Sequence, residues 1–354
     1  MNVYFYHTQD VQRIRREWIE GRFPSHFLYG ANHLPEYLIE VTFHRYKPID
    51  SRLHQMFRNL WQVLSHSRRI DAVFATHYQG LELLIFLRSL RLFPKPVVVW
   101  IHQPILPHKR WLRRIVSKLF FHGIDRMIFF SDKMLADSAA SGMASKSKMT
   151  VGHWGADLDF YDRLMRKYPE KRTGFVSTGK ERRDMPTLIK AFNAVGAPLA
   201  LYLPPECGEQ KYKSMMAEMN LGSNIKVEFV YGLKPYELSQ CVNRAACVVV
   251  CCYATNYTAG LTTVVEAMAL GLPVICSRNP QMPMDPERDG FGLSVDYGDV
   301  EGWKRAIEYI MNHPDEAAEM GRKARELAET TYNEDTCAMD VANVLDSLVW
   351  MKYD

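Results

Sequence analysis

The sequence predicts an α/β protein with two doubly wound parallel sheets. Short, nearly continuous apolar runs alternate with longer amphipathic segments, as they do where helices cover both faces of a parallel sheet. The length of 354 residues exceeds what one ordinary core organises and suits two domains. The charge balance also shifts, because residues 1–155 carry 22 Lys and Arg against 11 Asp and Glu, whereas residues 156–354 carry 22 against 29.

Ten apolar runs rich in β-branched residues are the expected strands. Four lie in the first half and six in the second: Val3–Tyr6, Ala72–Ala75, Val97–Ile101, Arg126–Phe130, Gly174–Thr178, Leu199–Leu203, Lys226–Val230, Cys247–Cys251, Pro273–Cys276 and Gly292–Val295. The clearest helical patterns are Met185–Val195, Tyr236–Arg244, Val300–Asn312 and Pro314–Tyr332. We therefore expect two Rossmann-like domains, over residues 1–155 and 156–334, that face a cleft. A final helix over residues 335–354 is expected to pack back on the first domain.

The composition excludes several classes of protein. Apolar residues make up 47% and charged residues 24%, which excludes a disordered chain, a collagen-like fibre and a disulfide-stapled mini-protein. The seven cysteines have no metal-type spacing, and Cys251 and Cys252 lie in an apolar run, which indicates reduced core residues. No stretch has the pattern of a signal peptide or of a membrane span. We expect a cytoplasmic protein that is soluble or peripheral on the inner face of the membrane.

The basic first half favours a polyanionic partner: a phospholipid surface, a phosphorylated acceptor or a nucleic acid. A solvated basic face without a partner is the alternative. Nucleic acid is disfavoured, because the chain has no recognisable binding module and its second half is acidic. In residues 109–121, apolar positions alternate with Lys and Arg in the pattern of an amphipathic, cationic helix. Such a helix either contacts an anionic membrane or packs its apolar side on the sheet.

One loop has the composition of a phosphate site. Residues 256–260 are small, hydroxylic or glycine and enter a helical pattern, so backbone N–H groups meet the positive end of a helix. Glu266, within that helix, can accept hydrogen bonds from ribose hydroxyls. The alternative is a well-capped helix with Glu266 on its surface.

The stretch that ends in Glu-Ala-Met-Ala-Leu-Gly-Leu-Pro-Val, from Glu266 onward, resembles the signature of glycosyltransferase family 4, which are retaining glycosyltransferases of the GT-B fold. That signature has two glutamates eight positions apart, and the resemblance implies that Glu266, the second, binds the nucleotide ribose. The first falls at Thr258, so the chain resembles a divergent member, and the donor sugar is not implied. The amides of Gly260, Leu261 and Thr262 are implied to face the donor sugar and diphosphate.

A basic turn follows the expected strand Gly174–Thr178. The resemblance implies that Lys180 and Arg183, after Gly179, contact the diphosphate. The chemistry supports this independently, because fixed cations stabilise the charge that a leaving diphosphate gains. The alternative is a solvated basic turn.

Weaker matches complete the resemblance. Tyr231 and Gly232 resemble the stretch whose backbone touches the nucleotide base, and residues 152–160 resemble the interdomain linker. That linker holds Asp157 and Asp159, a spacing that binds metal-diphosphate in another glycosyltransferase fold, but so short a motif is weak support for a metal. We expect no metal and no cofactor.

Polar residues that end buried parallel strands point toward the ligand site. His102 follows one expected strand and His77 another, and the family often places a histidine like His102 near the donor sugar. The alternative for each of the two is an interior histidine whose ring is hydrogen-bonded to the backbone. Arg13 and Arg16 follow the first strand and either hold an acceptor phosphate or face water.

The resemblance implies metal-independent transfer of a sugar, with retention, from a nucleotide-diphosphate sugar. The expected acceptor is a glycan or a lipid-linked molecule in cell-surface polysaccharide biosynthesis. The alternative is a non-catalytic nucleotide-sugar-binding protein, which Thr258 in place of a glutamate favours.

Overall fold

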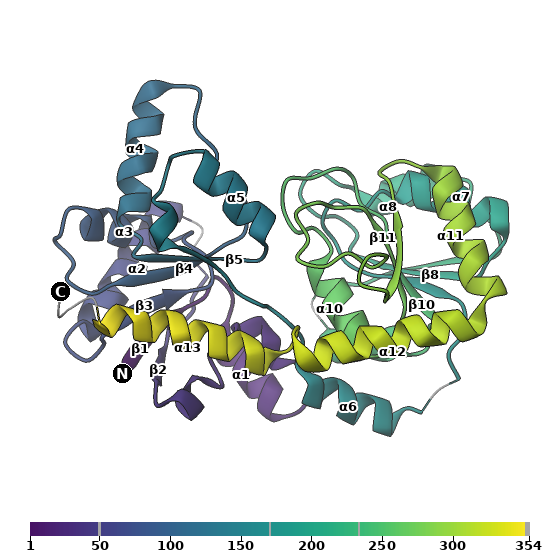
Figure 1. Ribbon diagram of the computed structural model, residues 1–354, viewed down its shortest axis with the longest axis horizontal. Helices are drawn as coiled ribbons and strands as arrows, with labels where there is room; N and C mark the ends of the chain where they lie inside the picture. Colours follow the sequence, from purple (N-terminus) through teal and green to yellow (C-terminus); the bar gives the residue numbers. More distant parts are fainter. Residues whose placement is uncertain (49–50, 170, 233, 351–354) are drawn as a thin grey trace. The chain divides into compact units, whose positions relative to one another are not determined.

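The computed structural model describes residues 1–48, 51–169, 171–232 and 234–350, and the chain forms two compact units (Figure 1). Unit 1 contains Met1–Gly21, Ser25–Trp154 and the C-terminal segment from Glu334. Unit 2 contains Arg22–Pro24 and Gly155–Asn333. No helix among the described residues combines the length and the apolar character that crossing a bilayer requires.

Unit 1 is built on a sheet of six parallel strands in the order β2-β1-β3-β4-β5-β6. The strands are β1 (Asn2–Tyr6), β2 (Glu40–Phe43), β3 (Ala72–Ala75), β4 (Val97–Ile101), β5 (Arg126–Phe129) and β6 (Met149–Val151). Its α-helices are α1 (Val11–Ile19), α2 (Arg52–His66), α3 (Glu82–Ser89), α4 (Trp111–His122), α5 (Asp132–Ala140) and α13 (Glu334–Trp350). The central strands β3 and β4 are buried along their whole length, as a sheet covered on both faces requires.

Unit 2 repeats this plan with the order β12-β11-β10-β7-β8-β9, again all parallel. The strands are β7 (Phe175–Ser177), β8 (Leu199–Leu203), β9 (Ile225–Phe229), β10 (Cys247–Val250), β11 (Val274–Ser277) and β12 (Gly292–Val295). The helices are α6 (Leu158–Lys167), α7 (Met185–Val195), α8 (Tyr212–Glu218), α9 (Pro235–Asn243), α10 (Leu261–Ala269), α11 (Val300–Asn312) and α12 (Pro314–Thr330).

The predicted fold class is confirmed, and each of the ten expected strands has a counterpart. Two further strands, β2 and β6, were not expected. Both lie at the edges of the unit 1 sheet, and β6 has only three residues. Edge strands are covered less completely, so they lack the continuous apolar run that marks a central strand.

The segment expected as a linker, residues 152–160, includes the start of a helix. Asp157 caps α6, and its side chain accepts a hydrogen bond from the Phe160 amide at 2.8 Å. An aspartate at this position satisfies an amide of the first turn that has no partner within the helix.

Helix α13 packs on unit 1, against the connection between α1 and β2. A side chain at Gly30 would bring its Cβ to 2.7 Å from the Ala338 backbone, so glycine is required where the two segments meet. At the start of α13, Glu334 accepts a hydrogen bond from Ser25 and pairs with His33 at 2.9 Å. Farther along, Asp340 pairs with His153 at 2.9 Å.

Candidate functional site

Open parallel sheets bind ligands beyond the carboxyl ends of the two strands between which the chain reverses its direction across the sheet. In unit 2 that point lies between β7 and β10, which are neighbours although β8 and β9 separate them in the sequence. Backbone hydrogen bonds join the loops that follow them: Asp184 N donates to Cys251 O at 3.0 Å, and Tyr253 N donates to Arg182 O at 2.8 Å. The two loops are therefore joined through their backbones.

Arg183 lies at the centre of this loop pair and is only 2% exposed. Its guanidinium donates to Thr178 O and Glu181 O at 3.0 Å each, to Cys252 Sγ at 3.3 Å and to Thr263 Oγ1 at 3.1 Å. These bonds use four of the five N–H groups of the side chain. All four acceptors are neutral, and no carboxylate of the residues that the structure describes forms an ion pair with Arg183.

Two glycines bring backbone close to this guanidinium. At Gly179, with φ of +102°, an added Cβ would lie 2.0 Å from Arg183 Nη2. At Gly260, with φ of +97°, an added Cβ would lie 2.6 Å from Val250 Cγ1 and 3.9 Å from Arg183 Nη1. Both positions need glycine for the backbone angle and for the space.

Helix α10 begins directly after Gly260, which has no side chain with which to cap it. The first-turn N–H groups of an uncapped helix, together with the helix dipole, attract an anion. One expectation is corrected here: the Leu261 amide donates to Thr258 O at 3.1 Å within the loop, so it is not available to a ligand. Thr258 itself is half-buried and contributes its carbonyl to this turn, and Thr262 is half-buried in the first turn of α10.

Glu266 lies on α10, one turn beyond Thr262, and is half-buried. Its carboxylate is beside the hydroxyl of Tyr161, which α6 contributes and which is fully buried. Burial, and then the nearby charge of Glu266, raise the pKa of Tyr161 above its ordinary value. The tyrosine thus stays protonated beside this carboxylate.

Lys180 is exposed, and its ammonium group is in solvent next to the Gly179 turn. The backbone at Lys180 is held from within, because the Tyr212 hydroxyl donates to Lys180 O at 2.8 Å. The same hydroxyl accepts from the Arg183 amide at 3.3 Å. Tyr212 therefore fixes the turn that carries both cations.

Tyr231 and Gly232 are not joined to this cluster. They follow the edge strand β9, and β8 separates β9 from β7. Neighbouring strands are about 4.8 Å apart, so this loop starts about 10 Å from the Arg183 loop. Tyr231 is 66% exposed.

No group of three His, Cys, Asp or Glu side chains within the described ranges has the geometry of a metal site. Of the Asp157 and Asp159 pair, Asp157 is buried as the cap of α6 and Asp159 is exposed on the helix. The two carboxylates are therefore in different environments.

In unit 1 the chain reverses direction between β1 and β3, and histidines follow these strands and β4. The rings of His77 and His102 have centroids 5.1 Å apart, and His102 Nε2 is 2.7 Å from Thr76 O. Burial, with His77 nearby, lowers the pKa of His102 to about 4. Burial likewise lowers the pKa of His77. Burial thus favours the neutral form of both rings. Because His102 Nε2 donates to Thr76 O, its Nδ1 is left as a hydrogen-bond acceptor, whereas His77 Nδ1 already accepts from the Gln79 amide at 2.9 Å and its Nε2 is left as a donor.

His7, at the end of β1, was not among the predicted site residues. It is 4% exposed, its Nε2 is 3.1 Å from Phe27 O, and burial lowers its pKa to about 4. The aromatic ring of Tyr29 lies 6.0 Å from both His7 and His102, so the three rings form one cluster. His7 could have been predicted as a site residue, because it follows a buried strand as His77 and His102 do.

Arg13 and Arg16 lie on the exposed side of α1. Arg13 pairs with Glu17 at 3.6 Å, which partly neutralises its charge. The structure brings neither arginine into contact with the histidine cluster through a described hydrogen bond or ion pair.

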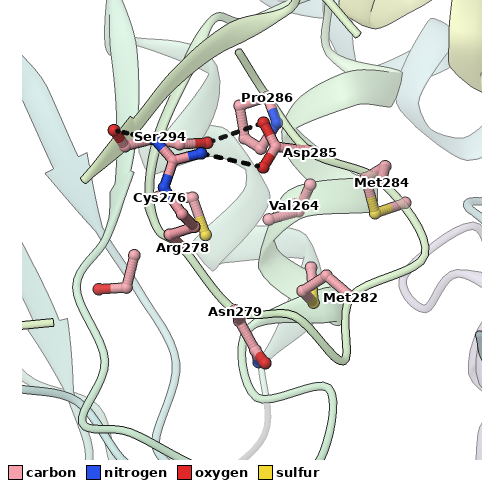
Figure 2. Close-up of a pocket in the computed structure, with 10 residues that line it drawn as sticks. Val264, Cys276, Arg278, Asn279, Met282, Met284, Asp285, Pro286 and Ser294 are labelled. Atoms are coloured by element: carbon pink, nitrogen blue, oxygen red, sulfur yellow. Dashed lines mark hydrogen bonds and ion pairs between the residues drawn. The ribbon is translucent and has the colours of Figure 1, made fainter. Parts of the chain in front are cut away.

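A small pocket lies beyond the carboxyl end of β11 and is lined in part by Val264 of α10 (Figure 2). Figure 2 shows the guanidinium of Arg278 turned toward Asp285. Arg278 also pairs with Glu287 at 2.9 Å and with Asp296 at 3.1 Å, so carboxylates neutralise it. This arginine differs from Arg183, whose acceptors are all neutral.

Residues 165–327 match the family model described as Glycosyl transferases group 1. No curated protein matches the chain in sequence.

Solved structures resemble the whole chain. Anabaena Alr3699/HepE, solved in complex with UDP-glucose, is 15% identical over 98% of this chain and 100% of that one, with a TM-score of 0.67. Sucrose-phosphate synthase from Thermosynechococcus elongatus is 16% identical over 99% of each chain, with a TM-score of 0.71. A glycosyltransferase from Rickettsia africae ESF-5 is 11% identical over 98% of each chain, with a TM-score of 0.67. At these identities the likeness shows the GT-B fold.

Proposed function

We propose, on the premise that residues 165–327 carry a glycosyl transferases group 1 domain, that the chain transfers a sugar from a nucleotide-diphosphate sugar to an acceptor and retains the anomeric configuration. The observation that carries the proposal is Arg183. Its charge is buried among neutral acceptors, under two glycine turns and beside the uncapped start of α10. A buried cation with no anion on it favours an anionic ligand, and a diphosphate fits.

The proposed chemistry needs no nucleophile from the protein. The bond between the sugar C1 and the diphosphate oxygen breaks, and its electron pair leaves with the diphosphate. The acceptor oxygen bonds to C1 on the same face, and its proton passes to the departing phosphate. Arg183, Lys180 and the amides at the start of α10 stabilise the charge that grows there, and Glu266 binds the ribose.

We propose that unit 1 takes the acceptor, with neutral His102 and His77 as polar contacts of the transferred sugar or the acceptor and with Arg13 and Arg16 nearer the surface. The acceptor is a glycan or a lipid-linked molecule of cell-surface polysaccharide biosynthesis. UDP-glucose is the first donor to test, because the Anabaena protein was solved with it.

Thermal unfolding of the purified chain against a panel of nucleotide sugars tests the proposal. We expect at least one nucleotide-diphosphate sugar, with UDP-glucose as the first candidate, to raise the Tm of the wild-type chain and to leave that of Arg183→Ala unchanged. If no member of the panel raises the Tm of the wild-type chain, the donor site is wrong.

A second candidate, a non-catalytic nucleotide-sugar-binding protein, is favoured by Thr258 at the position of the first signature glutamate. The release of UDP from UDP-glucose, measured with and without candidate acceptors, distinguishes the binding protein from the enzyme. Binding without any release of UDP supports the non-catalytic protein, and release that depends on Lys180 and Arg183 supports the enzyme.

A further inference from the structure

Helix α4 exposes most of its apolar side chains. Trp111 is 68% exposed, Leu112 59%, Ile115 56% and Val116 52%, and only Phe120 of this helix is buried. Phe120 packs on Tyr78 and Phe86 and so attaches the helix to its unit. Figure 1 shows α4 standing out from unit 1, at the upper left. Of the two alternatives from the sequence, packing of this side on the sheet is therefore excluded.

Helix α2 carries a second exposed apolar stripe. Leu53 is 64% exposed, Phe57 60%, Trp61 71% and Leu64 40%. Their spacing of four, four and three residues places them on one side of the helix. The buried residues of α2, Asn59 and Val63, lie on another side, so the stripe is not part of the core.

The two stripes belong to one layer of unit 1. The right-handed crossovers after β2, β3 and β4 all advance in the same direction across the sheet and so place α2, α3 and α4 on the same face. Helix α3 packs against both α2 and α4. Packed helices are about 8–10 Å apart, so the stripes are separated by roughly 20 Å.

The part of this layer from α2 to α4 is strongly basic. Residues 51–124 contain 12 Lys and Arg against two acidic residues, Asp71 and Glu82, and Glu82 pairs with Arg52 at 2.9 Å. On and before α4, the cations Lys109, Arg110, Arg113, Arg114 and Lys118 are all exposed. Within the described part of the chain, none of these five has an ion-pair partner.

We infer that this α2–α4 face, formed by the two stripes and the five cations, docks on an anionic lipid bilayer. Exposed apolar side chains flanked by Lys and Arg are what an anionic interface binds, and Trp61 and Trp111 are of the residue type that favours the headgroup region. The excess of 12 cations over two acidic residues in residues 51–124 gives the charge complementarity that selects this partner.

A second copy of the chain fits this face less well. Two such faces brought together would oppose the five exposed cations of one copy to the five of the other, which is repulsive. A bilayer that contains phosphatidylglycerol instead supplies one negative charge with each anionic headgroup.

The inference deepens the proposed function, on which the assignment of a lipid-linked acceptor rests. Docking would bring unit 1, the proposed acceptor unit, to the surface that displays such an acceptor. Docking is measured without any sugar transfer. Membrane docking and glycosyl transfer can therefore be contradicted independently of each other.

The test is co-sedimentation of the full chain with vesicles of phosphatidylcholine that contain or lack phosphatidylglycerol, across a salt series. We expect binding to phosphatidylglycerol vesicles at low salt that weakens as salt rises. Arg110→Glu/Arg113→Glu/Arg114→Glu should weaken binding by at least about tenfold. Phe57→Ser/Trp61→Ser on α2 and Trp111→Ser/Leu112→Ser on α4 should each weaken it several-fold.

The matched control is Arg163→Glu/Arg166→Glu/Lys213→Glu, three exposed cations of unit 2, which changes the net charge equally and should bind as the wild type. The Tm of each variant, with and without UDP-glucose, shows that the fold is intact. Vesicle binding without a response to any nucleotide sugar would leave docking standing and remove the proposed function.

Four results would overturn the inference. They are no binding at low salt, equal loss in the control variant, no effect of the α2 pair, and a dimer in light scattering that the same substitutions disperse. Binding of a DNA oligonucleotide that competes with vesicles and is stronger than them would reassign the face to nucleic acid.

Discussion

Arg183 holds a positive charge inside unit 2 and at the same time ties together the loops after β7 and β10. Its donors reach Thr178, Glu181, Cys252 and Thr263, which come from both loops and from α10. Removing the side chain leaves these acceptors unpaired and removes the cation from the proposed diphosphate site. The residue is therefore a positioning element for the loops as well as a proposed contact for the donor.

Arg183→Ala should lower both stability and donor binding. Loss of the charged hydrogen bonds should cost roughly 2–4 kcal/mol of unfolding free energy. We also expect UDP-glucose no longer to raise the Tm, as measured by thermal and urea unfolding. Arg182→Ala is the control, because its side chain is exposed, donates to Ala254 O and lies over the Tyr253 ring, away from the Arg183 acceptors. A variant that unfolds like the wild type and still binds the donor contradicts both roles.

Glu266→Gln should weaken donor binding and leave the fold intact. The neutral amide keeps the shape beside Tyr161 but loses the charge-assisted bonds to the ribose, which we expect to cost about 1–3 kcal/mol. Calorimetry with UDP measures this. The control is Glu308→Gln, an exposed residue of α11. Unchanged UDP affinity would remove Glu266 from the site.

At the scale of residues, the sequence indicated that Lys180 and Arg183 share the turn after β7 but not that their environments differ. Arg183 and Lys180 are three residues apart, yet one is buried and the other exposed. The difference arises from the turn at Gly179 and from the Tyr212 hydroxyl, both tertiary features. The bond between Leu261 N and Thr258 O likewise depends on loop geometry that no spacing encodes.

Helix α10 can begin where it does because Gly260 lets the backbone pass Val250. Gly260→Ala should strain this start and displace its amides, destabilising the chain by about 1–3 kcal/mol and removing the Tm increase by UDP-glucose. Gly298→Ala is the matched control, since its φ of +71° imposes the same backbone cost but no atom lies within 4 Å of an added Cβ. Equal effects of the two substitutions would show that the clash at Val250 is unimportant.

Helix α13 is attached to unit 1 by a pair that titrates. The hydrogen bond to Glu334 is the main cause that raises the pKa of His33 from 6.5 to about 9. Because the pKa of His33 is higher in the folded than in the unfolded chain, the pair stabilises the fold fully below pH 6.5. This stabilisation is lost as the pH rises through about 9. The attachment of α13 should therefore weaken between these two values.

His33→Gln should lower the Tm at pH 6 and make progressively less difference toward pH 9.5. Thermal unfolding of wild type and variant across this range measures the difference. His108→Gln, a substitution of an exposed histidine of the same unit, should change little at any pH. A difference that stays constant with pH would mean that the pair does not titrate with folding.

Among the elements, the central strands were the most predictable. Helices α7 and α11 begin and end at the residues that periodicity indicated. The edge strands β2 and β6 were missed, because half-exposed or very short strands carry little apolar pattern. The start of α6 was assigned to the linker, although Asp157 stands at the position of a helix cap. Whether a further strand adds to the edge of a sheet depends on tertiary contacts, which the local sequence pattern does not encode.

For the whole molecule, the charge contrast is smaller between folding units than between sequence halves. Unit 1 carries 22 Lys and Arg against 16 Asp and Glu, and unit 2 carries 22 against 24. The change arises because five acidic residues follow Asn333, in the segment that belongs to unit 1. The basic character of unit 1 is thus concentrated on its α2–α4 face, and an overall net charge describes it poorly.

Turnover by the whole protein should persist in EDTA. Arg183, Lys180 and the start of α10 supply the positive charge that a metal would otherwise bring to the leaving diphosphate. Release of UDP from UDP-glucose in the presence of EDTA measures this. Loss of release that Mn²⁺ or Mg²⁺ restores would revive Asp157 and Asp159 as ligands, and it would require Asp157 to leave the cap of α6.

The return of α13 to unit 1 has a consequence for how the chain is made. Residues 1–154 are synthesised before unit 2, yet unit 1 lacks Cys337, Ala338, Val341 and Leu345, all buried, until unit 2 has been made. Unit 2 is nearly continuous in the sequence and can finish earlier. Unit 1 is therefore expected to mature after unit 2, and a nascent chain that stops before residue 334 should leave uncovered the apolar surface on which α13 packs.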